Sequence, residues 1–206
     1  MSGGRLTSHR TGEPSYLAAP GSIPVLATSR RRGVCLGLRF RKRRRREGPV
    51  SDRLVRLWHD EDAVVAVFAA LRFEAESTGV VTPQVLDLDD PSSEFCLESG
   101  LKLLGDSLSL PVLLGLHLVR TGTHWPAGVY ASGAIRDARG YRCAAVAGAR
   151  SKLRLLEGLG YRRLFLPQKN YRELMLAGFD LQRTIALPTS VPTCLQIWDA
   201  FLRGTT

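Results

Sequence analysis

The sequence predicts an α/β domain preceded by a disordered basic tail, and three observations support this. Apolar residues make up 44% of the 206 positions, which is enough for one buried core. Strand-like and helix-like patterns alternate from residue 51 onward, with no internal repeat. The excess positive charge lies entirely in residues 1–50.

The charge distribution defines the predicted domain boundary. Residues 1–50 hold twelve Lys and Arg side chains against Glu13 and Glu47, which equals the whole net charge of +10. The other 156 residues carry no net charge, so composition gives no bulk electrostatic case for nucleic-acid binding by the domain. Because the first fifty residues are also rich in Gly, Ser and Pro, we predict a disordered tail over 1–50 and a domain over 51–206.

The arginine-rich run from Arg41 to Arg46 predicts weak, salt-dependent binding to nucleic acid. The same run fits a nuclear-type address, part of an Arg-rich transit peptide, or a solvated tail. An upstream start site that overextends the chain also fits. The sequence leaves these alternatives open.

Targeting and redox signals predict a cytoplasmic protein. No apolar run approaches the roughly 20 residues of a membrane span, and no signal-peptide core is present. The cysteines at 35, 96, 143 and 194 include no C-x-x-C pair, so we expect reduced thiols. The alternative is a four-cysteine zinc site assembled in space. We expect neither a cofactor nor a metal, and no membrane partner.

The first half of the predicted domain begins with a short amphipathic helix. Residues 51–62 place apolar side chains on one face after a Ser51 cap, and 63–75 form either a strand or a helix. Further strands are expected over 80–88 and 95–104. The acidic segment around Asp89 is predicted to be a turn rather than a metal site.

The second half contains the longest helices. A helix over 108–119 is apolar almost all round, as expected of a core element, and one over 149–159 ends at Gly160. His117 falls inside the first of these helices and is expected to be a core or interface residue, and His124 lies in a loop. The remaining elements are expected in this order: a strand over 129–135, a hairpin-like connection over 136–142, a strand over 162–166, a helix over 171–177, a strand over 181–187 and a helix over 192–202.

Two of these helices begin beside a polar reactive side chain. Ser107 precedes the helix over 108–119, and Lys152 lies in the first turn of the helix over 149–159. A helix N-terminus presents unsatisfied N–H groups and a partial positive charge, which stabilises an oxyanion and disfavours a protonated amine. These positions suit a serine nucleophile with a lysine general base.

The same residues resemble the proteolytic domain of the Lon protease family. Gly105-Asp106-Ser107-Leu108-Ser109 resembles the family's nucleophile motif GDSAS or DGPSAG, and Ala131-Ser132-Gly133 stands where the family has Thr-Gly. The stretch AGARSKLRLLEGLGYRRLFLPQKN resembles its lysine, helix, strand and Pro-x-x-Asn segment. The resemblance covers roughly residues 105–201. Ala147 replaces the first glycine of the family's pair, and the connection between Gly133 and Lys152 is slightly longer than usual.

This resemblance implies a Lon-like α+β fold, with a mixed sheet and packed helices, and a peptidase that works without an ATPase of its own. Ser107 falls on the nucleophile, Lys152 on the general base, and Ser109 on the glycine of the other motif version. The Ser132 hydroxyl would hold the lysine amine. The implied partners are a peptide or protein substrate, a separate ATPase or dedicated partner, and further copies of the chain in a homo-oligomeric ring. The alternative is a non-cleaving, ring-forming scaffold or nucleic-acid adaptor, since a Lon-like domain serves as a scaffold in a DNA-repair ATPase.

Overall fold

The computed structural model describes residues 21–29, 32–44, 46–58, 61–79, 84–88, 105–137 and 140–204. The strands are β1 (Ser22–Ser29), β2 (Arg32–Lys42), β3 (Gln84–Leu88), β4 (Val129–Ala131), β5 (Ala134–Arg136), β6 (Arg142–Ala144), β7 (Arg163–Pro167) and β8 (Thr184–Leu187). The helices are α1 (Asp52–Leu57), α2 (Glu61–Thr78), α4 (Ser109–Thr121), α5 (Ala149–Leu159), α6 (Gln168–Leu176) and α7 (Val191–Arg203).

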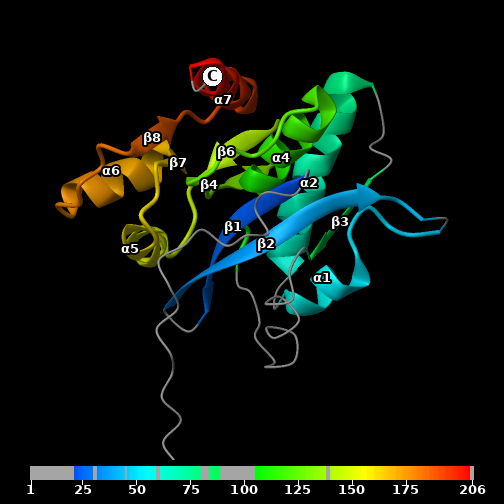
Figure 1. Cartoon of the computed structure of the whole chain (residues 1–206), viewed down its shortest axis with the longest axis horizontal. Helices are drawn as coiled ribbons and strands as arrows, with labels where there is room; N and C mark the ends of the chain where they lie inside the picture. The colour runs from blue at the N-terminus through cyan, green and yellow to red at the C-terminus, as the bar shows by residue number, and fades with distance from the viewer. Residues whose placement is uncertain are drawn as a thin grey trace, which may run out of the picture.

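The main sheet is mixed, in the order β3-β2-β1-β4-β7-β8. Strands β1, β2 and β3 pair antiparallel, whereas β4 pairs parallel with both β1 and β7, and β8 pairs parallel with β7. Strands β5 and β6 form a separate antiparallel pair. The predicted α+β class is therefore confirmed as a mixed sheet with packed helices (Figure 1).

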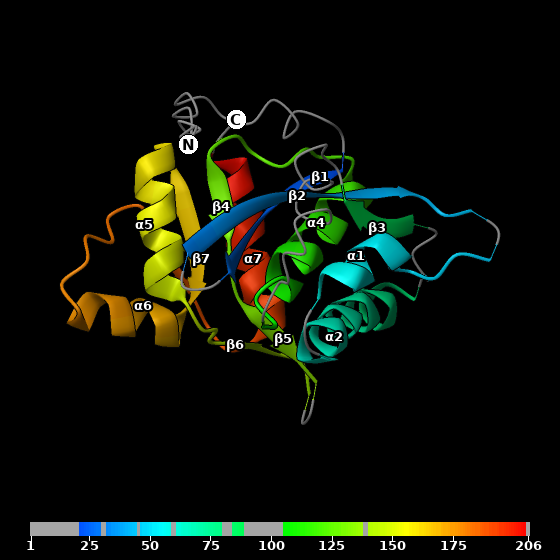
Figure 2. The ribbon, with the colours of Figure 1, turned by 90° about the horizontal axis from the view of Figure 1, so that it is seen from below.

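Helices cover both faces of this sheet, because successive strand residues point to opposite sides. Val25 and Phe165 pack into one core with α2, α4 and α7, whereas their neighbours Leu26 and Leu164 pack into a second core with α5 and α6. Figure 2 shows the two groups apart, with α5 and α6 on one side and α2 with α4 on the other. Gly115 lets α4 approach β1 closely, since a Cβ there would meet the Ile23 side chain at 2.2 Å.

The prediction of a disordered tail over residues 1–50 is wrong over Ser22–Ser29 and Arg32–Lys42, which form two central strands. The domain therefore starts well before residue 51. In β2 the residues Leu36, Leu38 and Phe40 are buried, and they alternate with Gly37 and Arg39. This alternation gives the strand one core face despite its many arginines. Residues 1–20 lie outside the described part of the chain.

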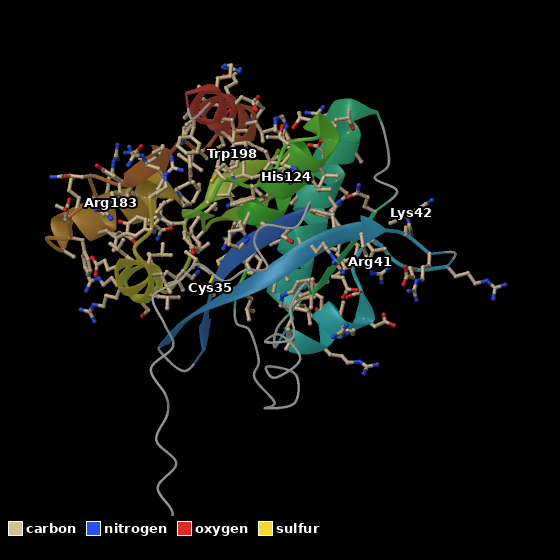
Figure 3. All side chains as sticks on the ribbon, viewed as in Figure 1. Cys35, Arg41, Lys42, His124, Arg183 and Trp198 are labelled. Carbon is tan, nitrogen blue, oxygen red and sulfur yellow. The ribbon has the colours of Figure 1, made fainter. Side chains whose placement is uncertain are left out.

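Arg41, near the end of β2, forms ion pairs, although most of the residues that follow β2 up to Gly48 are exposed. Arg41 Nε donates to Asp87 Oδ2 at 2.8 Å, and its two terminal nitrogens donate to the Glu47 carboxylate, each at 2.8 Å. Figure 3 labels Arg41 and Lys42 at this end of β2. At least Arg41 of the predicted nucleic-acid-binding run is thus part of the folded domain.

The first helices follow the sequence pattern in part. Ser51 caps α1 as predicted, because its hydroxyl accepts from the Leu54 N–H at 3.2 Å. The region 63–75, left open between strand and helix, lies within α2. Of the two strands expected next, β3 covers the end of 80–88, and 95–104 lies outside the described residues.

The second half agrees with prediction except at one break. Helices α4, α5, α6 and α7 and strands β7 and β8 appear within a few residues of the predicted bounds. The predicted strand over 129–135 is instead two strands, interrupted by Ser132 and Gly133. No helix of the described residues combines the length and apolarity needed to cross a membrane.

Candidate active site

Ser107 lies in the turn that leads into α4, as predicted, and is almost completely buried. Its hydroxyl donates to the Leu26 carbonyl oxygen of β1 at 3.4 Å, and its own carbonyl accepts from the Gly133 N–H at 3.2 Å. The residue is 3% exposed. Ser107 is therefore fixed against the central sheet rather than acting as a solvated helix cap; the N-cap of α4 is Leu108.

Lys152 lies in the first turn of α5, and its amide N–H donates to the Gly148 carbonyl at 3.0 Å. Its long side chain is only 1% exposed. The amine Nζ donates to the Ser132 hydroxyl at 3.1 Å, so the contact predicted between these residues is present. Among the described residues, no carboxylate lies within ion-pair distance of this amine.

Burial sets the protonation of Lys152. Loss of hydration lowers the pKa of its amine from 10.5 to about 7, because the charged form loses more solvation than the neutral one. The Asp106 carboxylate works in the opposite direction, as a nearby negative charge favours the ammonium. A large fraction of the amine is consequently unprotonated at neutral pH.

Ser132 and Gly133 connect the serine and the lysine. They interrupt the strand between β4 and β5, with Ser132 N–H donating to the Phe165 carbonyl at 3.0 Å and Gly133 O accepting from Leu110 N at 3.0 Å. A Cβ at position 133 would approach Leu110 Cδ2 to 2.8 Å and Pro167 Cγ to 3.0 Å, so this position has no room for a side chain. The tight packing brings α4, β4 and β7 together at the site.

The described hydrogen bonds do not join Ser107 to Lys152 directly. The Ser107 hydroxyl donates to Leu26 and the Lys152 amine to Ser132, with the Ser132-Gly133 backbone between them. The predicted dyad therefore has its two side chains linked through this dipeptide, each held by a different acceptor. Direct proton transfer requires the Ser107 hydroxyl to rotate away from Leu26.

Asp106 and Arg136 are site residues that the sequence did not reveal. The Arg136 guanidinium donates to Asp106 Oδ2 from two nitrogens, at 2.7 and 3.2 Å. This ion pair keeps a carboxylate next to Ser107 and within electrostatic range of Lys152. No local pattern could have indicated it, because the partners are 30 positions apart.

Ser109 is a structural residue of the same turn. It is fully buried, and its hydroxyl donates to the Asp106 carbonyl at 3.0 Å while accepting from the Ile135 N–H at 2.7 Å. It thereby joins the turn before α4 to β5. The spacing of three residues between donor and acceptor is a recognisable sequence signal for such a turn.

Asn170 positions the segment that precedes α5. Its side-chain oxygen accepts from Val146 N at 2.9 Å, and its amide nitrogen donates to Val146 O at 2.9 Å. Asn170 itself is only 1% exposed. The next glycine, Gly148, has φ +72°, a left-handed conformation that favours glycine. Ala147 has no positive φ, so an alanine at this position, where the Lon motif has a glycine, causes no backbone strain.

Two other sequence candidates do not join the site. His117 is buried as predicted, with Nε2 next to Asp199 Oδ1 at 2.7 Å and Nδ1 next to Arg120 Nη2 at 2.9 Å, so both ring nitrogens are engaged. His124 is exposed in its loop. Within the described residues, no three His, Cys, Asp or Glu side chains are arranged to hold a metal ion, and Cys96 lies outside them.

A pocket of about 480 Å³ opens at the β5–β6 pair, and its lining includes Arg136, Cys143 and Lys169 but neither Ser107 nor Lys152. Since Arg136 also bonds to Asp106, the pocket adjoins the turn that carries Ser107.

A scan against protein-family models found no match for this chain, and a search of the curated proteins found no relative.

Proposed function

We propose that this chain is a Lon-type serine peptidase, which hydrolyses peptide bonds with Ser107 and Lys152. One observation supports this most: the buried Lys152 amine has a pKa of about 7 and bonds to a hydroxyl rather than to a carboxylate. A buried lysine kept without a paired charge is costly for folding, so a chemical role explains its presence.

In the proposed reaction, the Ser107 hydroxyl rotates from the Leu26 carbonyl toward the neutral Lys152 amine. Lys152 removes the hydroxyl proton while Ser107 Oγ attacks the scissile carbonyl. The resulting ammonium then protonates the leaving amine, and water attacks the ester with Lys152 again as the base. Ser132 orients the amine throughout, and Asp106 stabilises the transient ammonium, because its negative charge lies within range.

The oxyanion would be held by backbone N–H groups at the start of α4. The N–H groups of Ser109 and Leu110 are already used, by Asp106 O and Gly133 O respectively. Among the described residues, the N–H groups of Ser107 and Leu108 meet no acceptor. These two donors lie at the helix end that stabilises negative charge.

The substrate would be a peptide or an unfolded protein segment that enters the pocket beside Arg136. We further propose a Lon-like fold, a homo-oligomeric ring, and delivery of folded substrates by a separate ATPase or dedicated partner. Any nucleic-acid binding would use the cations of the Arg41 to Arg46 run that the ion pairs leave exposed.

A fluorophosphonate probe tests the proposal directly. The full chain should be labelled on Ser107, as read by intact mass and peptide mapping, and Ser107→Ala should remove both labelling and cleavage of an unfolded protein. Lys152→Arg should reduce both by about 10³-fold or more, because a guanidinium stays protonated near neutral pH. Asp52→Asn, on the distant helix α1, serves as the control and should behave as the wild type. An unlabelled Ser107 in the folded wild type, or full activity in Lys152→Arg, contradicts the peptidase and leaves the scaffold alternative.

A further inference from the structure

A second pocket lies at the other end of the parallel strands β4 and β7 from Ser107 and Lys152. Ser132 follows the carboxyl end of β4, and Pro167 ends β7 beside it, so the dyad lies at the carboxyl ends of these parallel strands. Residues at the amino ends, including Arg162 and Arg163, line a pocket of about 740 Å³ with the C-terminal end of α7. The two sites are therefore separate.

Three arginines line this pocket, and among the described residues no carboxylate lines it. Arg162 precedes β7, Arg163 is the first residue of β7, and Arg183 precedes β8; all three are exposed. The Arg163 Nη1 donates to the Arg162 carbonyl at 3.0 Å, and the Arg183 Nη1 to the Tyr161 carbonyl at 3.1 Å. Figure 3 labels Arg183 on the side of the molecule that carries β8 and α6.

Four other arginines of the described structure are neutralised by carboxylates. Arg41, Arg72, Arg120 and Arg136 each form an ion pair with a carboxylate. Among the described residues, Arg163 and Arg183 bond only to backbone oxygens, the Arg183 guanidinium lies over the Tyr161 ring at 6.0 Å from its centroid, and the Arg162 side chain forms no hydrogen bond. Three like charges without a counter-charge repel one another, and an anionic ligand removes that repulsion.

The chemistry of the pocket selects phosphate. A guanidinium donates paired hydrogen bonds to phosphate or carboxylate oxygens, but a terminal phosphate carries close to two negative charges at neutral pH, and a nucleic-acid backbone presents one on each of several successive phosphates. Three guanidiniums match that charge better than they match a single carboxylate. The Arg183 guanidinium lies over the Tyr161 ring, and the partly exposed Phe201 gives an apolar wall for the remainder of a ligand.

We infer that the pocket formed by Arg162, Arg163, Arg183 and the end of α7 binds a phosphate group, independently of the dyad. The phosphate comes either from a small phosphorylated molecule or from a nucleic-acid backbone.

Calorimetric titration of the full chain distinguishes the two sources. The probes are sodium pyrophosphate and a twelve-nucleotide single-stranded DNA, at low ionic strength, since salt screens exposed charges. Arg183→Gln and Arg162→Gln should each weaken the binding of whichever probe the wild type binds by about tenfold. Arg172→Gln, an exposed arginine on α6 outside the pocket, removes the same charge and should bind as the wild type does.

Each outcome has a defined meaning. Pyrophosphate binding that both pocket variants weaken supports a small-molecule site, and DNA binding that they weaken more strongly supports a nucleic-acid backbone. Because the Arg162 side chain makes no hydrogen bond within the described structure, Arg162→Gln keeps the test valid if Arg183→Gln unfolds. Absence of binding by the wild type overturns the inference. Binding by both pocket variants as tight as that of the wild type also overturns the inference, because the arginine-rich run near Arg41 would then be responsible.

Discussion

Arg41 and Lys152 are two cations of one small domain in opposite environments. Hydrogen bonds from Arg41 to Glu47 and Asp87 raise the pKa of its guanidinium further above its ordinary value. Lys152 has no such partner, and burial lowers the pKa of its amine to about 7. The paired cation connects β2 to β3 and stabilises the fold, whereas the unpaired one opposes folding and is suited to proton transfer. Charge pairing therefore distinguishes the structural cation from the one that we propose for catalysis.

Asp87, an ion-pair partner of Arg41, has a lowered pKa, as expected of a structural ion pair. Burial works to raise the pKa of Asp87, but hydrogen bonds from Ser51 and Arg41 outweigh it and leave the pKa below its ordinary value. The Ser51 hydroxyl and the Leu88 N–H both donate to Asp87 Oδ1, and Arg41 donates to Oδ2. One carboxylate thus joins the ends of β2, β3 and α1.

The largest expected effect on stability comes from deleting the segment that carries Arg41. Deleting residues 1–47 removes β1 and β2, two of the six strands of the sheet, together with the Leu26 carbonyl that accepts from Ser107. The truncated chain should fail to fold, whereas deletion of residues 1–20 should leave a cooperative transition. Circular dichroism and thermal melting measure both. A folded product that begins near residue 48 would show that the strands are dispensable.

Removing the unpaired cation should stabilise the fold. In the folded state the pKa of Lys152 is about 7, against 10.5 for a free lysine, which corresponds to a penalty of about 4 kcal/mol at pH 7. Lys152→Met removes this penalty, so its free energy of unfolding should exceed that of the wild type by up to that amount. Urea denaturation at pH 7 measures the difference.

The pH dependence of that difference gives an internal control. Because the folded pKa lies below the unfolded one, the unfolded chain binds the extra proton, and wild-type stability rises with pH. The penalty is complete below pH 7 and vanishes as the pH approaches 10.5, so the advantage of Lys152→Met should shrink over that interval. A constant advantage, or none at pH 7, contradicts a buried neutral amine.

Breaking the paired cation should have a smaller effect of opposite sign. Asp87→Asn leaves Arg41 with Glu47 alone and should lower the free energy of unfolding by about 2 kcal/mol. Since the pKa of Asp87 is lowered, its stabilisation is present at neutral pH and is lost in acid, below the ordinary carboxyl pKa of 3.8. Urea denaturation should show that the free energies of unfolding of Asp87→Asn and the wild type differ at pH 7 and become equal in acid. Asp52→Asn is the matched control, on the same side of the domain. Equal stability of Asp87→Asn and the wild type at pH 7 would mean that the ion pair is not structural.

Local patterns predicted the second half of the chain well. The bounds of α5 match because Gly148 and Gly160 mark both ends with left-handed conformations, and apolar spacing marked α4 and α7. The placement of Ser107 and Lys152 beside helix starts, and the contact between Lys152 and Ser132, were also predictable. These features depend on residues close in sequence or on one motif.

Long-range pairing was not predictable in the same way. The arginines of β2 suggested a disordered tail, although buried Leu36, Leu38 and Phe40 alternate along the strand; their burial depends on pairing with β1 and β3. Asp87 lies 46 positions from Arg41, so net charge alone could not reveal the ion pair. Similarly, Gly133 at the break between β4 and β5 packs tightly against Pro167 and Leu110, which are distant in sequence, so local propensity could not reveal the break.

The central claim is that Lys152 is an uncharged amine near neutral pH. Carbon-13 labelling of lysine Cε followed by NMR titration measures this directly, with Lys152→Met used to assign the resonance. The wild-type Lys152 signal should titrate with a midpoint of about pH 7. A Lys152 signal that remains that of an ammonium up to pH 10 would contradict the account.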